Sequence, residues 1–158
     1  MSVSKKSASS GLSAVPGRIL AIDYGQKRFG LALSDEMRMT AQPLATLERT
    51  NRRNDLRRLR DIVRQHEVRQ IVVGHPVHLD GSASEMAAEA ARFAKRLEKE
   101  LSLPVVLADE RLSSWEAGQM LAEAKPRKRA RTQVDQVAAA VILRDYLERL
   151  RHKAEVRR

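Results

Sequence analysis

The chain has 158 residues, a net charge of +10 and no cysteine; this length fits one domain, and the missing cysteines exclude disulfide bonds, thiolate metal sites and a cysteine nucleophile. No apolar run approaches the roughly 20 residues that cross a bilayer, and residues 1–17 lack the apolar core of a secretory signal peptide, which predicts a cytoplasmic protein. The excess of basic residues favours nucleic acid as a partner.

A β-hairpin is the first structured element that the sequence predicts. Residues 1–17 are rich in serine and have no periodicity, which indicates a disordered tail before it. Within 18–34, two short apolar runs flank a polar turn bracketed by Gly25 and Gly30, a pattern typical of two buried strands. The segment 43–47 predicts a third strand at the sheet edge, where its proline is tolerated.

Helices and strands alternate along the rest of the chain. In order, the patterns predict a helix from a cap at Asn54 to His66, a strand at 71–73, a helix opened by Ser82, a strand at 104–108, a helix at 113–124 and a last helix capped by Thr132. This order predicts an α/β fold with a mixed five-stranded sheet, antiparallel strands first and parallel strands next, and helices on both faces. We expect one domain at 18–151 and a basic tail at 152–158.

Acidic residues from separate segments are expected to meet at one rim of this sheet. Asp23 ends the first strand, Asp109 and Glu110 follow the last strand, and Asp135 comes three positions after the Thr132 cap. Each alone has an ordinary explanation, as a turn residue or as a carboxylate that interacts well with a helix dipole. Like charges gathered at one rim repel strongly, however, unless cations lie between them.

Such a set of oxygen ligands suits Mg²⁺ or Mn²⁺ better than zinc. Two of these ions about 3.5–4 Å apart activate water and stabilise the leaving oxygen in phosphodiester cleavage. The segment 125–131 carries five basic residues and no acid, close to Asp135 in the sequence. It is either a solvated loop or a surface that holds phosphates against the acids; its candidate contacts are Arg127, Lys128, Arg129 and Arg131. The residues therefore favour a metal-dependent nuclease.

Four blocks carry a more specific pattern: IDYGQKRFGLA at 22–32, VGHPVHLDG at 73–81, DERLSSWEA at 109–117 and VDQVAAA at 134–140. In this order they resemble the motifs of the YqgF (RuvX) family of pre-16S rRNA nucleases, relatives of RuvC-type Holliday junction resolvases. The resemblance implies a ribonuclease H-like fold and a hydrolase, either an endonuclease or an exonuclease, that matures the 5′ end of pre-16S ribosomal RNA during ribosome biogenesis.

The resemblance also assigns roles to individual residues. It implies that Asp23, Glu110 and Asp135 are the catalytic and metal-binding acids, with Asp109 as a further candidate ligand. Lys27, Arg28 and Arg111 match basic family positions, where they either contact phosphate or neutralise the acids. His75 and His78 stand where the family more usually has an apolar residue and an amide. For His78, a substrate contact and a tolerated surface histidine are both open.

Other functions remain open at this stage. One is a Holliday junction resolvase that acts on branched DNA, and another is a non-catalytic protein that binds nucleic acid or the small ribosomal subunit. A third is a fragment of an actin-like ATPase, but nothing in the chain repeats the hairpin that such proteins need twice. No dimerisation signal is evident, which predicts a monomer or a weak homodimer, and structured RNA is the favoured substrate.

Overall fold

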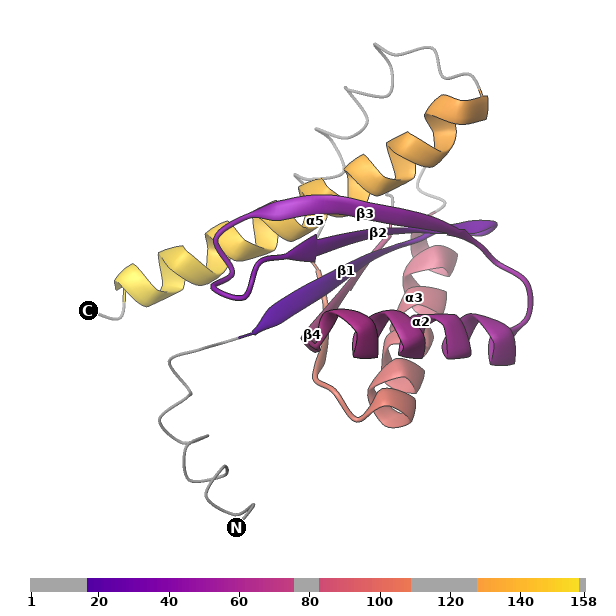
Figure 1. Cartoon of the computed structure of the whole chain (residues 1–158), viewed down its shortest axis with the longest axis horizontal. Coiled ribbons are helices and arrows are strands. Elements are labelled where there is room, and N and C mark those ends of the chain that lie inside the picture. Colours follow the sequence, from indigo (N-terminus) through magenta and orange to yellow (C-terminus); the bar gives the residue numbers. More distant parts are fainter. Residues whose placement is uncertain (1–16, 76–82, 109–127, 157–158) are drawn as a thin grey trace.

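Five strands form one sheet, and helices cover both of its faces (Figure 1). The computed structural model describes residues 17–75, 83–108 and 128–156. In chain order the elements are β1 (Arg18–Tyr24), β2 (Arg28–Ser34), β3 (Ala41–Glu48), α2 (Arg52–His66), β4 (Val68–Gly74), α3 (Ala83–Leu101), β5 (Val105–Leu107) and α5 (Lys128–Val156). None of the helices in these ranges is long and apolar enough to cross a membrane.

The strand order β3-β2-β1-β4-β5 confirms the predicted mixed sheet. β1 pairs antiparallel with β2, and β2 pairs antiparallel with β3. On the other side β1 pairs parallel with β4, which pairs parallel with β5. Antiparallel hairpin strands followed by parallel strands are the arrangement that the ribonuclease H-like prediction requires. β1 is therefore the central strand of the sheet.

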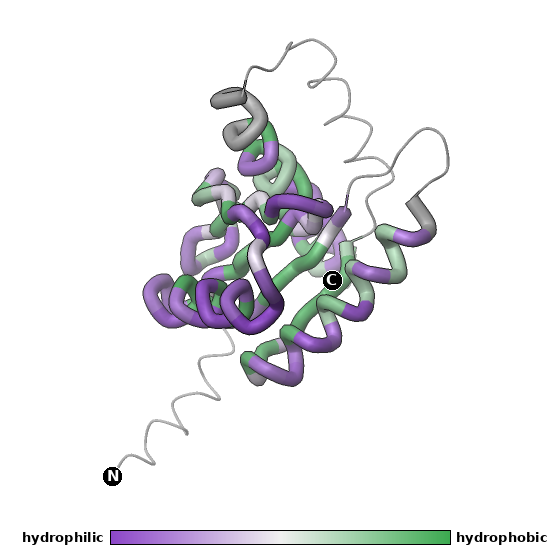
Figure 2. Tube along the Cα trace, turned by 90° about the vertical axis from the view of Figure 1, so that its right-hand side faces the viewer, coloured by the Kyte–Doolittle hydropathy of each residue, from purple (hydrophilic) through white to green (hydrophobic). Residues whose placement is uncertain are grey.

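Alternation of side chains along β1 gives the sheet two buried faces. Leu20 and Ile22 belong to a core that includes side chains of α2 and α3, whereas Ile19 and Ala21 belong to a second core with α5. Figure 2 shows hydrophobic residues along the strands and hydrophilic residues on the outer sides of the helices. A strand segment that is buried on both sides favours apolar residues at every position, which explains the uninterrupted apolar run at 19–22 within β1.

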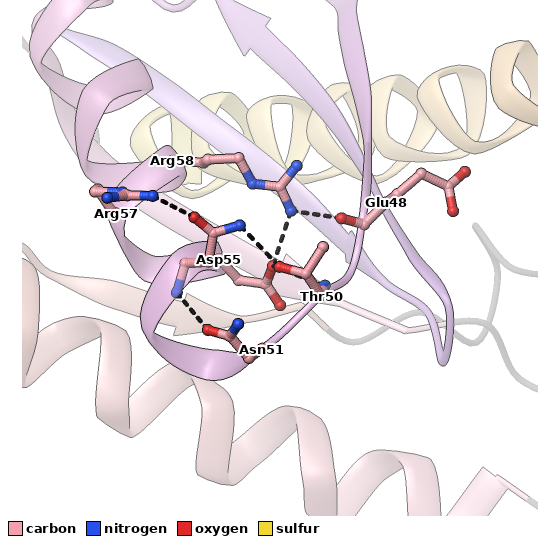
Figure 3. A network of polar contacts seen from close by, with 7 residues as sticks. Glu48, Thr50, Asn51, Asp55, Arg57 and Arg58 are labelled. Carbon is pink, nitrogen blue, oxygen red and sulfur yellow. Dashed lines mark hydrogen bonds and ion pairs between the residues drawn. The ribbon is translucent and has the colours of Figure 1, made fainter.

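The start of α2 differs from the prediction. Asn51, not Asn54, is the N-cap, because its side chain accepts a hydrogen bond of 2.9 Å from the backbone N–H of Asn54 (Figure 3). Asn54 lies in the first turn and donates instead to the Thr50 hydroxyl. Both asparagines are good caps in sequence, and the anchoring of Thr50 by a buried carboxylate further along the helix selects the earlier one.

That carboxylate, Asp55, is only 6% exposed. Its Oδ1 accepts hydrogen bonds from the backbone N–H of Thr50 at 3.0 Å and from Arg58 Nη2 at 2.8 Å (Figure 3). Burial by itself would raise the pKa of Asp55, but these hydrogen bonds outweigh burial and lower the pKa below its usual value. The network holds the end of β3 against the beginning of α2.

The beginning of α5 also differs from the prediction. Residues 128–131, expected in a loop, are helical, so Thr132 lies inside the helix rather than at its cap. Lysine, arginine and alanine are all good helix formers, and they extend the helix toward its N-terminus. Asp135 consequently lies beyond the first turn, and the predicted stabilisation of this carboxylate by the helix dipole is wrong. The predicted capping residue Ser82 and the predicted helix at 113–124 lie outside the described residues.

We expect Asp55→Ala to lower the free energy of unfolding by about 2 kcal/mol, because it leaves the Thr50 N–H and the Arg58 guanidinium without their buried acceptor. Urea unfolding followed by circular dichroism measures the loss. Asp61→Ala, which removes an exposed carboxylate from the same helix, is the matched control. Equal stabilities of the two variants would show that the Asp55 network does not stabilise the fold.

Candidate active site at the end of the central strand

Asp23 lies near the C-terminal end of β1, on the sheet face that α5 covers. It follows Ile19 and Ala21 on that face, and its partners in the two adjacent strands are Gly30 and Gly74. The residue is only 9% exposed. Among the described residues, none donates a hydrogen bond to its carboxylate. A buried acid without hydrogen-bond donors is costly, and sites of this kind are often functional.

The helix α5 brings Asp135 to the same place. A Cβ atom at Gly30 would lie 2.0 Å from the Asp135 carbonyl oxygen and 3.1 Å from its Cβ, so the helix backbone passes directly over this glycine. Since Gly30 is also the cross-strand partner of Asp23, the two carboxylates are neighbours. The structure therefore brings together two of the acids that the sequence predicts to meet, from positions 112 residues apart.

Arg28 binds one of these two acids. Its Nε lies 2.9 Å from Oδ2 of Asp135, and both side chains are about one-quarter exposed, at 28% and 26%. This hydrogen bond raises the pKa of the Arg28 guanidinium above its usual value. Two roles were predicted for Arg28, a phosphate contact or neutralisation of the acids, and the ion pair with Asp135 does not decide between them. The Asp23 carboxylate remains without a cation among the described residues.

Burial and the nearby Asp135 carboxylate raise the pKa of Asp23 from 3.8 to about 7. A divalent cation placed between two such carboxylates removes their repulsion and favours the ionised form of both. Two hard oxygen donors suit Mg²⁺ or Mn²⁺, so the residues present fit the predicted metals. Two acids alone form an incomplete ligand set, and no cluster of three candidate ligands occurs in the described ranges.

The other predicted site residues stand as follows. Glu110, Asp109, Arg111, His78 and Arg127 lie outside the described residues, so the structure does not test them. Lys128, Arg129 and Arg131 lie in the first turns of α5. Lys27 is exposed in the turn between β1 and β2, and His75 is half-buried directly after β4, the strand beside Asp23.

Sequence reasoning missed a second polar feature, on the opposite sheet face. A pocket of about 400 Å³ lies there, bordered by Arg49, Arg52, Arg92 and Arg96. We call it the arginine pocket. The net charge of residues 18–124 is close to zero, because acids elsewhere in this range offset these arginines, and the sum therefore concealed the pocket. Two features of the sequence could have indicated this pocket. Arg92 and Arg96 are four residues apart, which places both on one side of a helix, and further arginines lie around residue 50.

Comparisons with known proteins identify relatives of this chain. A family model described as "RuvX: Holliday junction resolvase" matches residues 17–149. The chain is 49% identical to a protein of Koribacter versatilis named "Putative pre-16S rRNA nuclease", over 87% of this chain and 90% of that protein. A Moorella thermoacetica protein of the same name is 46% identical, over 84% and 96%. The solved structure of Thermus thermophilus RuvC with a Holliday junction substrate is similar at a TM-score of 0.47 and 14% identity, over 80% of this chain and 91% of that one.

The raised pKa of Asp23 predicts an unusual dependence of stability on pH. Between about pH 4 and pH 7 the folded protein keeps a proton on Asp23 that the unfolded chain has lost, so the free energy of unfolding falls as the pH rises. The fall is up to about 4 kcal/mol for the metal-free protein. Asp23→Asn cannot titrate, and we expect it to exceed the wild type in stability at pH 8 but not at pH 4.

Urea unfolding in EDTA at both pH values measures this difference. Asp145→Asn, at a partly exposed position of α5 that is paired with Arg149, is the control with the same chemical change. A stability difference between Asp23→Asn and the wild type that does not change with pH would contradict a raised pKa at Asp23.

The contact at Gly30 is equally testable. We expect Gly30→Ala to lower the free energy of unfolding by about 1–3 kcal/mol or more, because the new methyl group meets helix backbone that can move only with the whole of α5. The variant should also bind Mn²⁺ more weakly than the wild type in isothermal titration calorimetry, since displacing α5 displaces Asp135. Gln42→Ala, at an exposed position of β3, should change neither quantity.

Proposed function

This chain belongs to the RuvX family, and from this membership we propose that it is a divalent-metal-dependent nuclease that hydrolyses phosphodiester bonds in structured RNA. The observation that carries the proposal is the buried Asp23 beside Asp135, with Arg28 hydrogen-bonded to Asp135. Such a pair of carboxylates has a clear chemical use in holding hard cations, and an arginine beside it is suited to a phosphate.

The proposed mechanism assigns a task to each side chain. Asp23 and Asp135 hold Mg²⁺ or Mn²⁺, and the family resemblance adds Glu110, with Asp109 as a further candidate. When bound, two such ions supply an activated water and stabilise the leaving oxygen. Arg28 orients the Asp135 carboxylate through its hydrogen bond of 2.9 Å. Lys27, exposed one residue before it, contributes positive charge for the approaching phosphate.

Burial of Asp23 contributes to catalysis through the water that it excludes. A carboxylate at 9% exposure has few competing water molecules, so a cation placed beside it interacts strongly with the acid. The close approach of α5 at Gly30 fixes the separation between the two acids. Metal ligands held by a central strand and a long helix keep their geometry better than ligands on loops.

The substrate that we propose is precursor 16S ribosomal RNA. Its support is the name shared by relatives 37–49% identical to this chain. The family description, which names Holliday junction resolution, supports a second candidate, cleavage of branched DNA. With the first substrate, we propose that the protein acts on the pre-ribosomal small subunit, as a monomer or a weak homodimer.

Cleavage assays test the proposal directly. We expect Asp23→Asn and Asp135→Asn each to lower the rate of RNA cleavage at least about 100-fold with Mg²⁺ or Mn²⁺, because each variant weakens the cation site. End-labelled RNA spanning the 5′ end of 16S ribosomal RNA and a four-way DNA junction are the two substrates. The faster-cleaved substrate identifies the activity.

Two controls make the result specific. Asp145→Asn places the same substitution on α5 at the Arg149 ion pair and should keep full activity. EDTA should abolish cleavage by the wild type. Cleavage that persists in EDTA, or that both site variants retain at the wild-type rate, would contradict a metal-dependent nuclease built on these acids.

A further inference from the structure

The arginine pocket lies at the same end of the sheet as the acid pair, on the opposite face. Asp23 and Tyr24 are consecutive residues of β1, so their side chains point to opposite faces. Tyr24 borders the pocket together with Phe29 and Phe93, whose rings lie 5.6, 4.9 and 5.1 Å apart in pairs. The end of β1 therefore has the acid pair on one face of the sheet and the arginine pocket on the other.

The pocket has an excess of positive charge. Four arginines border it, against the two carboxylates Asp55 and Glu89. Arg58, which is not among the bordering residues, already binds Asp55 at 2.8 Å. Within the described part of the chain, none of Arg52, Arg92 and Arg96 forms an ion pair. Cations gathered around a cavity of this kind attract an anion, which relieves their mutual repulsion.

Arg49 forms a fixed wall of the pocket. Its guanidinium lies 4.8 Å from the ring centre of Tyr24 and 5.1 Å from that of Phe29. Nη1 also donates to the carbonyl oxygen of Gly25 at 2.7 Å and to that of Gln26 at 3.2 Å. These contacts leave Arg49 little freedom, and an anion that binds it meets a donor already in place.

The size and chemistry of the cavity limit the ligand. A volume of about 400 Å³ lies within the range of small-ligand sites and exceeds what a simple ion needs. Arginine guanidinium groups bind phosphate through paired hydrogen bonds. Thr50 and Glu89 border the same space, and the Glu89 carboxylate can accept hydrogen bonds from hydroxyl or amino groups. A nucleotide offers phosphate, hydroxyl and amino groups together.

We propose that the arginine pocket binds a nucleotide of the substrate strand, with its phosphate among Arg49, Arg52, Arg92 and Arg96, while the bond to be cut lies at Asp23 on the other face. This inference rests on the proposed nuclease function. The acid pair and the arginine pocket lie at the same end of β1. This favours a nucleotide of the substrate over a free nucleotide as the ligand, because a nucleic-acid strand that crosses this edge of the sheet reaches both sites.

Binding measurements with a charge-matched pair of variants test the proposal. The pocket variant is Arg52→Gln, Arg92→Gln and Arg96→Gln combined. The control variant is Arg64→Gln, Lys95→Gln and Lys99→Gln, which removes the same charge from exposed positions of the same two helices. Circular dichroism verifies that both fold. Fluorescence anisotropy then follows the binding of single-stranded RNAs of about 4 and about 16 nucleotides in Ca²⁺, over a range of salt concentrations.

We expect the pocket variant to bind the longer RNA about 10- to 100-fold more weakly than the wild type near 0.1 M salt. Its slope of log K against log salt should be smaller by about 0.7, because the variant loses the one phosphate that the pocket neutralises. The control variant should change affinity by less than about 3-fold. In cleavage assays the pocket variant should raise KM and keep kcat, because the acids are untouched.

The outcomes separate the pocket from the proposed function. A wild type that neither binds nor cuts RNA or DNA overturns both. A wild type that cuts, with pocket and control variants that bind alike, overturns the pocket alone. Adenosine monophosphate tests the other source of phosphate: if it raises the melting temperature of the wild type but not of the pocket variant, while both bind RNA equally, the pocket takes a free nucleotide and the strand assignment is wrong.

Discussion

The contact between α5 and β2 at Gly30 determines the geometry of the candidate site. Only a residue without a side chain allows the Asp135 backbone to lie over the strand, at a distance where a Cβ would meet its carbonyl oxygen at 2.0 Å. Gly30 pairs with Asp23 across the ladder, so this single contact brings a helix carboxylate to a strand carboxylate. The apolar contacts further along α5, including Ile142 and Leu143, then keep the helix on the sheet.

The two acids have different surroundings, and the difference has chemical consequences. Asp135 is partly exposed and bound by Arg28, which supports its charge, whereas Asp23 is buried and faces that charge with no hydrogen-bond donor among the described residues. In the proposed function, a proton and a divalent cation therefore compete for Asp23. Burial raises the cost of leaving the acid ionised, and the same burial strengthens the attraction of any cation that replaces the proton.

The local pattern of apolar and polar residues predicted most of the sheet. The features that it did not predict depend on contacts between segments far apart in the sequence. Apolar runs bounded by Gly25 and Gly30 identified the hairpin, and Asp23 followed from its place at the strand end. The predicted start of α5 was wrong, because a run of basic residues resembles a loop in composition yet has high helix propensity. The arginine pocket was missed because its residues come from three segments, and neither periodicity nor net charge reports which segments meet.

The acid pair and the arginine pocket share one turn, between β1 and β2. Arg49 donates to the carbonyl oxygen of Gly25, and the N–H of Gly25 donates to the carbonyl oxygen of Arg28 at 3.1 Å. Arg28 in turn holds Asp135. The Gly25 turn is tight enough that a Cβ there would lie 2.6 Å from the same Arg28 oxygen. Since these links are hydrogen bonds of 2.7 to 3.1 Å to buried or half-buried groups, we expect a ligand that repositions Arg49 to strain this turn or to move Arg28 with it.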